Sequence, residues 1–134
     1  MKRIPLNVLT KELYELLTAN LTVPVYDDVP YDAVLPYVTF GLFTCKTAGT
    51  KVNDISDVTI NIDIWSDYQG KSEVNTIAHE VIGLLNQLDS TTVDLTADNF
   101  AFLAGEVDFF EAFAEDGNGY HGVITYLCKI GNME

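Results

Sequence analysis

Basic side chains are scarce in this sequence. Seven Lys and Arg stand against 20 Asp and Glu, which gives a formal net charge of −13. Binding to a DNA or RNA backbone depends on Lys and Arg that displace counterions, and binding to an anionic membrane surface needs the same side chains. The charge argues against both. Three interpretations of the charge remain. The protein could be a soluble acidic domain whose copies repel one another, it could bind a basic protein, or it could form a surface past which nucleic acid slides without binding.

Long apolar runs and targeting signals are also missing. No stretch of about twenty apolar residues occurs, so no membrane-spanning helix is predicted. We expect no signal peptide, because Lys11 and Glu12 interrupt the apolar stretch that follows Leu6. With 134 residues and 48% hydrophobic side chains, the chain is expected to form one domain, residues 1–134, whose core needs no disulfide or metal for folding.

Cysteine is rare as well. The two cysteines, Cys45 and Cys128, both fall in segments with a strand pattern. We interpret them as buried free thiols in a reducing cytoplasm. A disulfide would require their strands to be neighbours, which the sequence does not reveal. Zinc is not expected, because neither a Cys-x-x-Cys pair nor clustered histidines accompany them.

The chemistry of catalysis is poorly represented. A nucleophile elbow, a P-loop, a dinucleotide fingerprint and a zinc-binding helix motif are all absent. His79 is interpreted as a helix-surface residue and His121 as a turn or strand-edge residue. Acidic residues gather in loops without matching a calcium-binding loop, and Asp63 and Asp67 are attributed to a strand followed by a helix cap. No catalytic residue, metal site or cofactor is predicted. The acidic loop clusters are Asp27, Asp28 and Asp32, and Asp54 with Asp57.

The most informative pattern that is present runs from Ile55 to Leu88. Apolar residues first alternate with polar ones, as in a half-buried strand. After Trp65 and Ser66 the apolar spacing changes to three and four, as on one face of an amphipathic helix. The strand face is Val58, Ile60, Ile62 and Ile64, and the helix face is Val74, Ile77, Ala78, Val81, Ile82, Leu85 and Leu88.

The remaining segments complete an α+β fold, a mainly antiparallel β-sheet with two α-helices packed on one face. Pro5 and Asn20 are read as the signals that flank the first helix. The predicted segments are a helix over 6–19, an extended piece over 23–26, a loop over 27–32, a strand over 37–45, a loop over 46–54, short strands over 93–95 and 100–110, a turn over 116–119, a strand over 122–130 and a loose tail over 131–134.

Two segments stand out as candidate surfaces. The polar segment Lys46–Asp54 contains a glycine and two of the seven basic residues, and predicts a long, mobile hairpin loop. Phenylalanines alternate with acids between Phe100 and Asp116. Core packing explains this second pattern, and an exposed aromatic patch at a protein interface is the alternative.

Three short motifs occur in an order that resembles a known family. They are Tyr26-Asp27-Asp28-Val29-Pro30, Leu35-Pro36-Tyr37-Val38-Thr39-Phe40-Gly41, and Ile64-Trp65-Ser66 with Gly70 opening a helix. In this order, the chain resembles the tail completion proteins of long-tailed bacteriophages, also called tail-to-head joining or tail terminator proteins. Those of Bacillus siphophages resemble it most.

The resemblance implies a virion assembly protein and not an enzyme. Such proteins cap the head-proximal end of the tail tube, usually as a sixfold ring, and dock to the head connector. The implied partners are the tail tube protein, the head-closure protein and further copies of the chain, with assembly in the host cytoplasm. The position of the 46–54 loop implies an interface that becomes ordered on assembly. Its candidate residues are Lys46, Thr47, Gly49, Thr50, Lys51, Asn53 and Asp54.

The acidity then has a physical interpretation. A ring around the DNA path should repel phosphates and let DNA slide without specific binding. The same charge opposes self-association, so we expect a monomer alone and a ring only on a tail-tube template. A second hypothesis is an acidic DNA mimic that inhibits a host nucleic-acid enzyme. It needs carboxylates spaced like phosphates on one face, whereas here they are spread over several loops. A metal-dependent enzyme is the third, and it lacks convergent ligands.

Overall fold

A computed structural model describes residues 1–115, 117 and 119–134 of the chain. It contains two α-helices, one short 3-10 helix and five β-strands. The elements are α1 (Leu6–Asn20), β1 (Val25–Tyr26), β2 (Tyr37–Thr47), β3 (Ile55–Ser66), α2 (Ser72–Leu85), η1 (Thr96–Asp98), β4 (Phe100–Glu115) and β5 (Gly119–Asn132).

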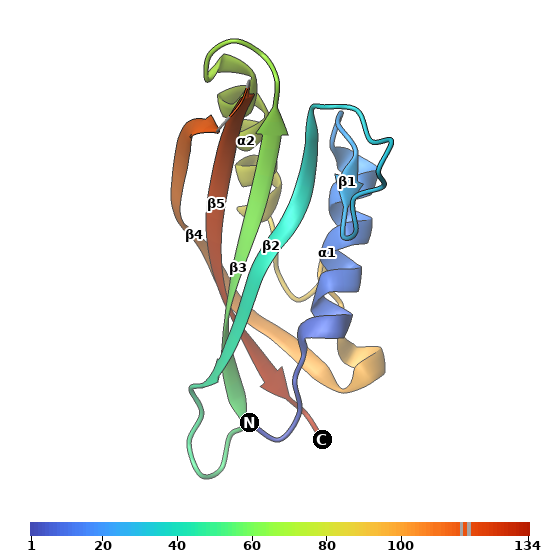
Figure 1. The fold of residues 1–134 in the computed structure, drawn as a ribbon. Coiled ribbons are helices and arrows are strands. Elements are labelled where there is room, and N and C mark those ends of the chain that lie inside the picture. Colours follow the sequence, from blue (N-terminus) through green and yellow to red (C-terminus); the bar gives the residue numbers. More distant parts are fainter. Residues whose placement is uncertain (116, 118) are drawn as a thin grey trace.

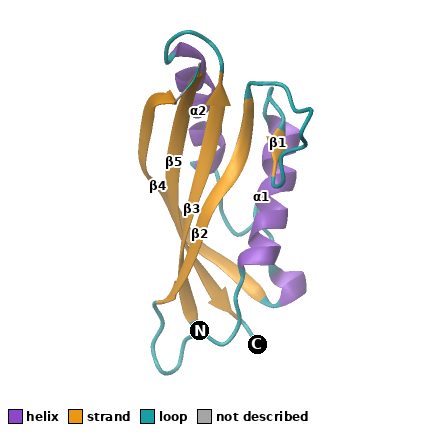
Figure 2. Cartoon of the chain, in the orientation of Figure 1, coloured by secondary structure: helices purple, strands orange, loops and turns teal. Residues whose placement is uncertain are grey.

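The strands form one sheet in the order β1-β2-β3-β5-β4. The short β1 pairs with β2 in parallel, and every other pairing is antiparallel. Both helices lie behind the same face of this sheet, and the other face carries no second layer (Figure 1, Figure 2). The predicted α+β class, a mainly antiparallel sheet with two helices on it, is therefore confirmed.

Strand β3 lies at the centre of the sheet and shows the predicted alternation. Its even-numbered residues from Ser56 to Ser66 are buried, whereas its odd-numbered residues are partly accessible. Because successive side chains of a strand point to opposite faces, the even-numbered set faces the helices. The odd-numbered set faces the uncovered side, which we call the open face.

The core fills the space between the sheet and the two helices. Buried aliphatic side chains come from α1, α2, β3 and β5, and burying each contributes about 1.5–3 kcal/mol relative to exposure. The predicted face of α2 is confirmed at Val74, Ile77, Ala78, Val81 and Leu85, whereas Ile82 is half-buried. The fully or nearly fully buried members include Leu9, Leu13 and Leu17 of α1, Val74, Ile77, Val81 and Leu85 of α2, Ile60, Ile62 and Ile64 of β3, and Ile124, Tyr126, Cys128 and Ile130 of β5.

Three predictions for the part of the chain between β3 and β4 were wrong. The segment 93–95 is not a strand: Val93 and Leu95 are buried, but they belong to an irregular connection before η1. Helix α2 ends at Leu85, and Leu88 packs against the core from the following turn. The helix begins at Ser72 without a side-chain cap, so the assignment of Asp67 to a cap was also wrong.

The predicted loose tail is partly ordered. Strand β5 continues to Asn132, because the backbone amide of Asn132 donates to the carbonyl of Asp54 and its side chain binds both Asp54 and Arg3. These partners lie far away in the sequence, so the local pattern could not indicate them. Strand β4 likewise runs on to Glu115. Two residues of the predicted 116–119 turn, Asp116 and Asn118, lie outside the described residues.

The two cysteines are separated by a strand. Cys45 of β2 pairs with Val58 of β3, and Val58 pairs on its other side with Cys128 of β5. Both thiols are free, and Cys128 is buried while Cys45 is half-buried. No helix in the described part of the chain has the length and apolarity needed to cross a membrane.

Candidate interaction surface

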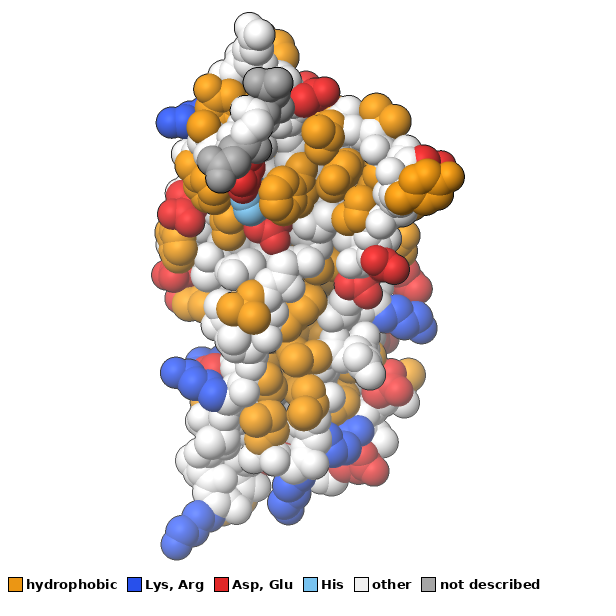
Figure 3. All heavy atoms as spheres, in the orientation of Figure 1, with side chains coloured by type: hydrophobic (Ala, Val, Ile, Leu, Met, Phe, Trp, Pro, Cys, Tyr) orange, Lys and Arg blue, Asp and Glu red, His pale blue; other side chains and the backbone are white. Residues whose placement is uncertain are grey.

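The open face of the sheet is the first feature of the candidate surface. It is built from residues of β2, β3, β5 and β4 that point away from the helices. Figure 3 shows this face, with hydrophobic side chains along its middle and Lys and Arg side chains gathering towards its lower end. The strand pairing arranges side chains in rows across this face. One row, which crosses all four strands, consists of Tyr37, Trp65, His121 and Phe113.

A histidine cluster lies at one end of this face. The imidazole of His121 stacks on the indole of Trp65 and lies against the ring of Phe113. His121 Nδ1 lies 2.6 Å from Glu115 Oε1, and Nε2 lies 2.7 Å from Asp63 Oδ1. The histidine side chain is only 12% exposed. It therefore links β3 to both strands of the β4–β5 hairpin.

The geometry gives the imidazole a positioning role. A carboxylate only accepts hydrogen bonds, so both contacts are satisfied together when both ring nitrogens carry a proton. The resulting pair of charge-assisted bonds is stronger than neutral ones. Sequence reasoning placed His121 at a turn or strand edge and missed this cluster, because it depends on the pairing of Trp65 with His121.

The rest of the cluster is supported from β2. Trp65 Nε1 donates to Thr39 Oγ1 at 3.0 Å. Gly41 leaves room for the carboxylate of Asp63, since a Cβ at that position would meet Asp63 Oδ2. Trp65 is thus held by the hydrogen bond from its indole nitrogen, and His121 by the contacts of its two ring nitrogens with carboxylates.

The predicted loop lies at the opposite end of the sheet. Lys46 and Thr47 are the last residues of β2, so the connection itself spans residues 48–54. Within it, Thr50 Oγ1 accepts from the amides of Val52 and Asn53, and the amide of Thr50 donates to the carbonyl of Asn53. A Cβ at Gly49 would meet that same Asn53 carbonyl oxygen, so the tight turn requires glycine.

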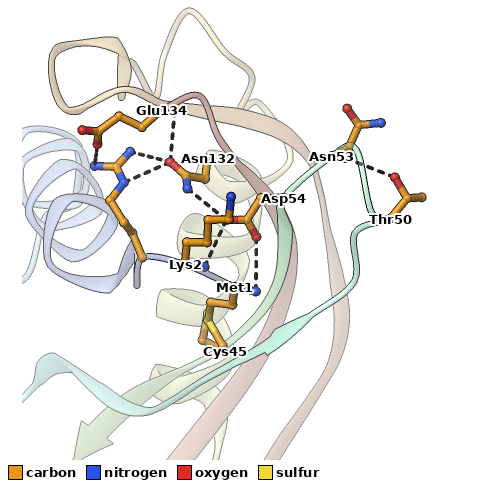
Figure 4. Close-up of polar contacts among 9 residues, drawn as sticks. Met1, Lys2, Cys45, Thr50, Asn53, Asp54, Asn132 and Glu134 are labelled. Carbon is orange, nitrogen blue, oxygen red and sulfur yellow. Dashed lines mark hydrogen bonds and ion pairs between the residues drawn. The ribbon is translucent and has the colours of Figure 1, made fainter.

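Asp54 anchors the base of this loop to both ends of the chain (Figure 4). Its carboxylate accepts from the backbone amide of Lys2 at 3.0 Å and from Asn132 Nδ2 at 2.9 Å, and the Met1 amino group lies 3.3 Å away. The hydrogen bond from Asn132 is the largest of the effects that lower the pKa of Asp54, followed by that from Lys2. The ionised carboxylate is therefore the form that holds this junction.

Arg3 extends the junction towards η1. Its guanidinium donates to the Asn132 side chain and to the carbonyls of Asp98 and Asn99, and it forms an ion pair with Glu134 at 2.8 Å. It also lies over the ring of Phe100, 3.9 Å from its centroid. Five groups on two segments, residues 98–100 and 132–134, thus fix this side chain at the end of the sheet that carries the loop.

The other predicted polar residues do not converge. His79 is exposed on α2, as predicted. Among the described residues, no group of three or more His, Cys, Asp or Glu side chains is arranged to hold a metal ion. At the Trp65 junction, Ser66 Oγ donates to Glu73 Oε1 at 2.6 Å and accepts from the amide of Tyr68, so Ser66 links β3 to α2. These features are those of a framework that presents surfaces.

Comparisons with known proteins agree with this description. The sequence model of the family described as "Tail completion protein gp17" matches residues 10–130. A chain in a solved structure, "Virion of native gene transfer agent (GTA) particle", superposes with a TM-score of 0.67 at 16% identity, covering 92% of this chain and 91% of that one. At that identity the likeness establishes the fold alone. No curated protein matches the sequence.

Proposed function

Because the chain belongs to the tail completion protein gp17 family, we propose that it caps the head-proximal end of a phage tail tube and joins the tail to the head connector. Membership of this family makes it a structural protein of the phage tail, part of the virion. The observation that carries the finer proposal is the match over residues 10–130, which includes most of α1 and of β5, the whole of the other helices and strands, and the 48–54 connection. In this proposal residues 1–134 act as one domain.

The proposed protein works through contacts with other proteins. Its partners are the tail tube protein, the head-closure protein of the connector, and further copies of itself in a ring of six. From the sequence motifs we infer that the protein resembles the tail-to-head joining protein of a Bacillus siphophage. DNA passes through the ring without specific binding, because a net charge of −13 per copy repels phosphates.

The 46–54 segment is the proposed contact with a neighbouring protein. All seven candidate residues, Lys46, Thr47, Gly49, Thr50, Lys51, Asn53 and Asp54, lie at one end of the sheet. Val52 at the loop tip is 90% exposed, and Lys46 and Lys51 are exposed beside it. An exposed apolar side chain next to free cations is a surface suited to an acidic partner. Asp54 differs from the others, since it is half-buried and holds the loop base.

Electron microscopy of virions tests the location. Density that fits this fold is expected between the last ring of the tail tube and the connector, and it should be missing from tails made without the protein. Density for this fold elsewhere in the particle would refute the proposed location.

A further inference from the structure

We propose that an acidic strip on strand β4 receives the lysine-bearing loop end of a second copy of this chain. The strip consists of Glu106, Asp108, Phe109, Glu111 and Phe113, and the loop end consists of Lys46, Lys51 and Val52. The inference rests on the proposed ring of copies and adds to it the two surfaces that meet.

The strip is accessible and unpaired. Strand β4 forms one edge of the sheet, so its outer side has no strand partner in this chain. Glu106, Asp108 and Glu111 are exposed, and no ion pair within the described part of the chain involves their carboxylates. Phe109 is 48% exposed and Phe113 is 39% exposed. Aromatic side chains of this kind are favoured anchors at protein interfaces.

Strand β4 is also irregular at this point. Its pairing with β5 shifts register between Val107 and Phe109, which leaves Asp108 without a partner in the ladder. A bulge and charged side chains are the usual protection of an edge strand against unspecific pairing. Contact with the strip is therefore selective for a partner that neutralises its carboxylates.

The loop end supplies the matching charge. Three cationic groups on the chain are paired with acids: the Met1 amino group with Asp54, Arg3 with Glu134, and Lys129 with Asp57 at 2.6 Å. The side chains of Lys2, Lys11 and Lys71 form no ion pair among the described residues, and Lys51 differs from them in lying next to the 90% exposed Val52. Lys46 and Lys51 are exposed, and the described residues offer them no ion pair. Val52, which follows Lys51 in the chain, would provide the apolar part of the contact together with the phenylalanines of the strip.

Charge selects the orientation of the two copies. Two chains of −13 repel each other on average, so a contact that pairs free lysines with unpaired carboxylates is favoured over the others. Strands β3 and β5 lie between Lys46 on β2 and the strip on β4. Lys46 and Glu106 both line one hollow that crosses these strands. The loop end and the strip are nevertheless different surfaces, so a contact between the loop end of one copy and the strip of another is head-to-tail, and its repetition closes a ring when the rotation permits.

Charge reversal tests the pairing. The variants K46E/K51E and E106K/D108K should each weaken copy-to-copy association on tail tubes about tenfold or more at low salt, as expected for close charge pairs. Combining all four substitutions in one chain should restore association, because the signs are exchanged at every contact. K11E/K71E, which changes the charge as much as K46E/K51E at exposed positions elsewhere, is the control. Failure of the four-residue variant to recover, or equal weakening by the control, would overturn the pairing.

Cross-linking locates the contact without any substitution. A mixture of ¹⁴N- and ¹⁵N-labelled protein at high concentration is treated with a carbodiimide, which joins a lysine amine to a carboxylate that touches it. Mixed-isotope peptide pairs report links between copies only. We expect such pairs to join Lys46 or Lys51 to the strip. Links confined to other residues, or no mixed pairs, would contradict the inference.

The two proposals fail separately. If the solution links form as expected but the protein is missing from the head-proximal end of tails, the proposed function fails and the strip contact stands. If the protein is found at that end while K46E/K51E completes tails as well as the wild type, the strip contact fails and the function stands.

Discussion

The imidazole of His121 stacks on the indole of Trp65, with ring centroids 3.8 Å apart and 16° between the ring planes. This stack holds His121 so that its two nitrogens meet carboxylates from different strands, Asp63 and Glu115. One side chain thus ties the central strand to the β4–β5 hairpin at the end of the open face opposite the loop.

Replacing His121 by Leu should lower the free energy of unfolding by about 2 kcal/mol, because two half-buried carboxylates lose their donor. Urea unfolding measures the change. The variant H121L/D63N/E115Q is the matched control. It should recover part of the loss, since neutral amides do not repel each other. A loss below about 0.5 kcal/mol for H121L would mean that the cluster adds no more than an ordinary surface site.

Replacing Asp54 by Asn should reduce the acid sensitivity of folding. The pKa of Asp54 is lowered from its ordinary 3.8, chiefly by the hydrogen bond from Asn132. A lowered folded pKa means that the stabilisation is present above 3.8 and is lost as the pH falls through the folded value. Stability should therefore fall less for D54N than for the wild type between about pH 6 and about pH 2.

D67N is the control for this effect, because Asp67 is exposed and accepts no hydrogen bond from the described residues. It should keep the pH dependence of the wild type. The D54N variant should also exchange its loop amides, those of Thr50, Val52 and Asn53, faster than the wild type. If D54N and D67N gave the same pH profile and the same exchange, the anchoring role of Asp54 would be wrong.

Replacing Tyr126 by Phe should leave stability unchanged or raise it by up to about 1 kcal/mol. The Tyr126 hydroxyl is buried, none of the described residues forms a hydrogen bond with it, and burial raises its pKa well above the usual range. The ring itself is part of the core and stays. Thermal unfolding is the measurement, and a loss above about 1 kcal/mol would reveal a partner for the hydroxyl.

The two thiols should differ in reactivity. Cys45 is half-buried, whereas Cys128 is buried and burial raises the pKa of its thiol to about 12. A thiol-reactive chromogenic disulfide at mild pH should therefore label one thiol per folded chain and two after unfolding. The variant C45S should abolish the fast reaction. Rapid labelling of both thiols in the folded chain would contradict the burial of Cys128.

The purified protein should sediment as a monomer at physiological salt and form a ring only on a tail-tube template. The expectation follows from the net charge of −13, which opposes association. Raised salt should not by itself produce a ring, because it screens the attraction between the free lysines and the strip as well as the overall repulsion. A stable hexamer in the absence of tubes would end the template hypothesis.

Much of the fold could be predicted because its signals are local. The alternation from Val58 to Ile64 predicted strand β3, and the spacing of apolar residues from Val74 to Leu85 predicted the buried face of α2. The features that sequence reasoning missed depend on distant partners. Asn132 is ordered by Arg3 and Asp54, and His121 by Asp63 and Trp65. The strand register fixes such contacts, and the local pattern of each segment did not reveal that register.

The phenylalanine-rich segment shows the same limit. Phe100 and Phe102 are buried, as the core interpretation predicted, whereas Phe109 and Phe113 are exposed, as the interface alternative predicted. The register shifts of β4 between Phe102 and Ala104 and between Val107 and Phe109 change which residues face the core. Alternation alone could not locate these bulges.

The most direct test of the proposed function is an add-back experiment with tails assembled in the absence of this protein. Purified protein is mixed with such tails and with DNA-filled heads, and joined particles are counted by electron microscopy and by infectivity. The account predicts that joining depends on the protein and is restored when it is added. If heads joined these tails equally well without it, or if added protein left joining at the background level, the proposed role in tail completion would be contradicted.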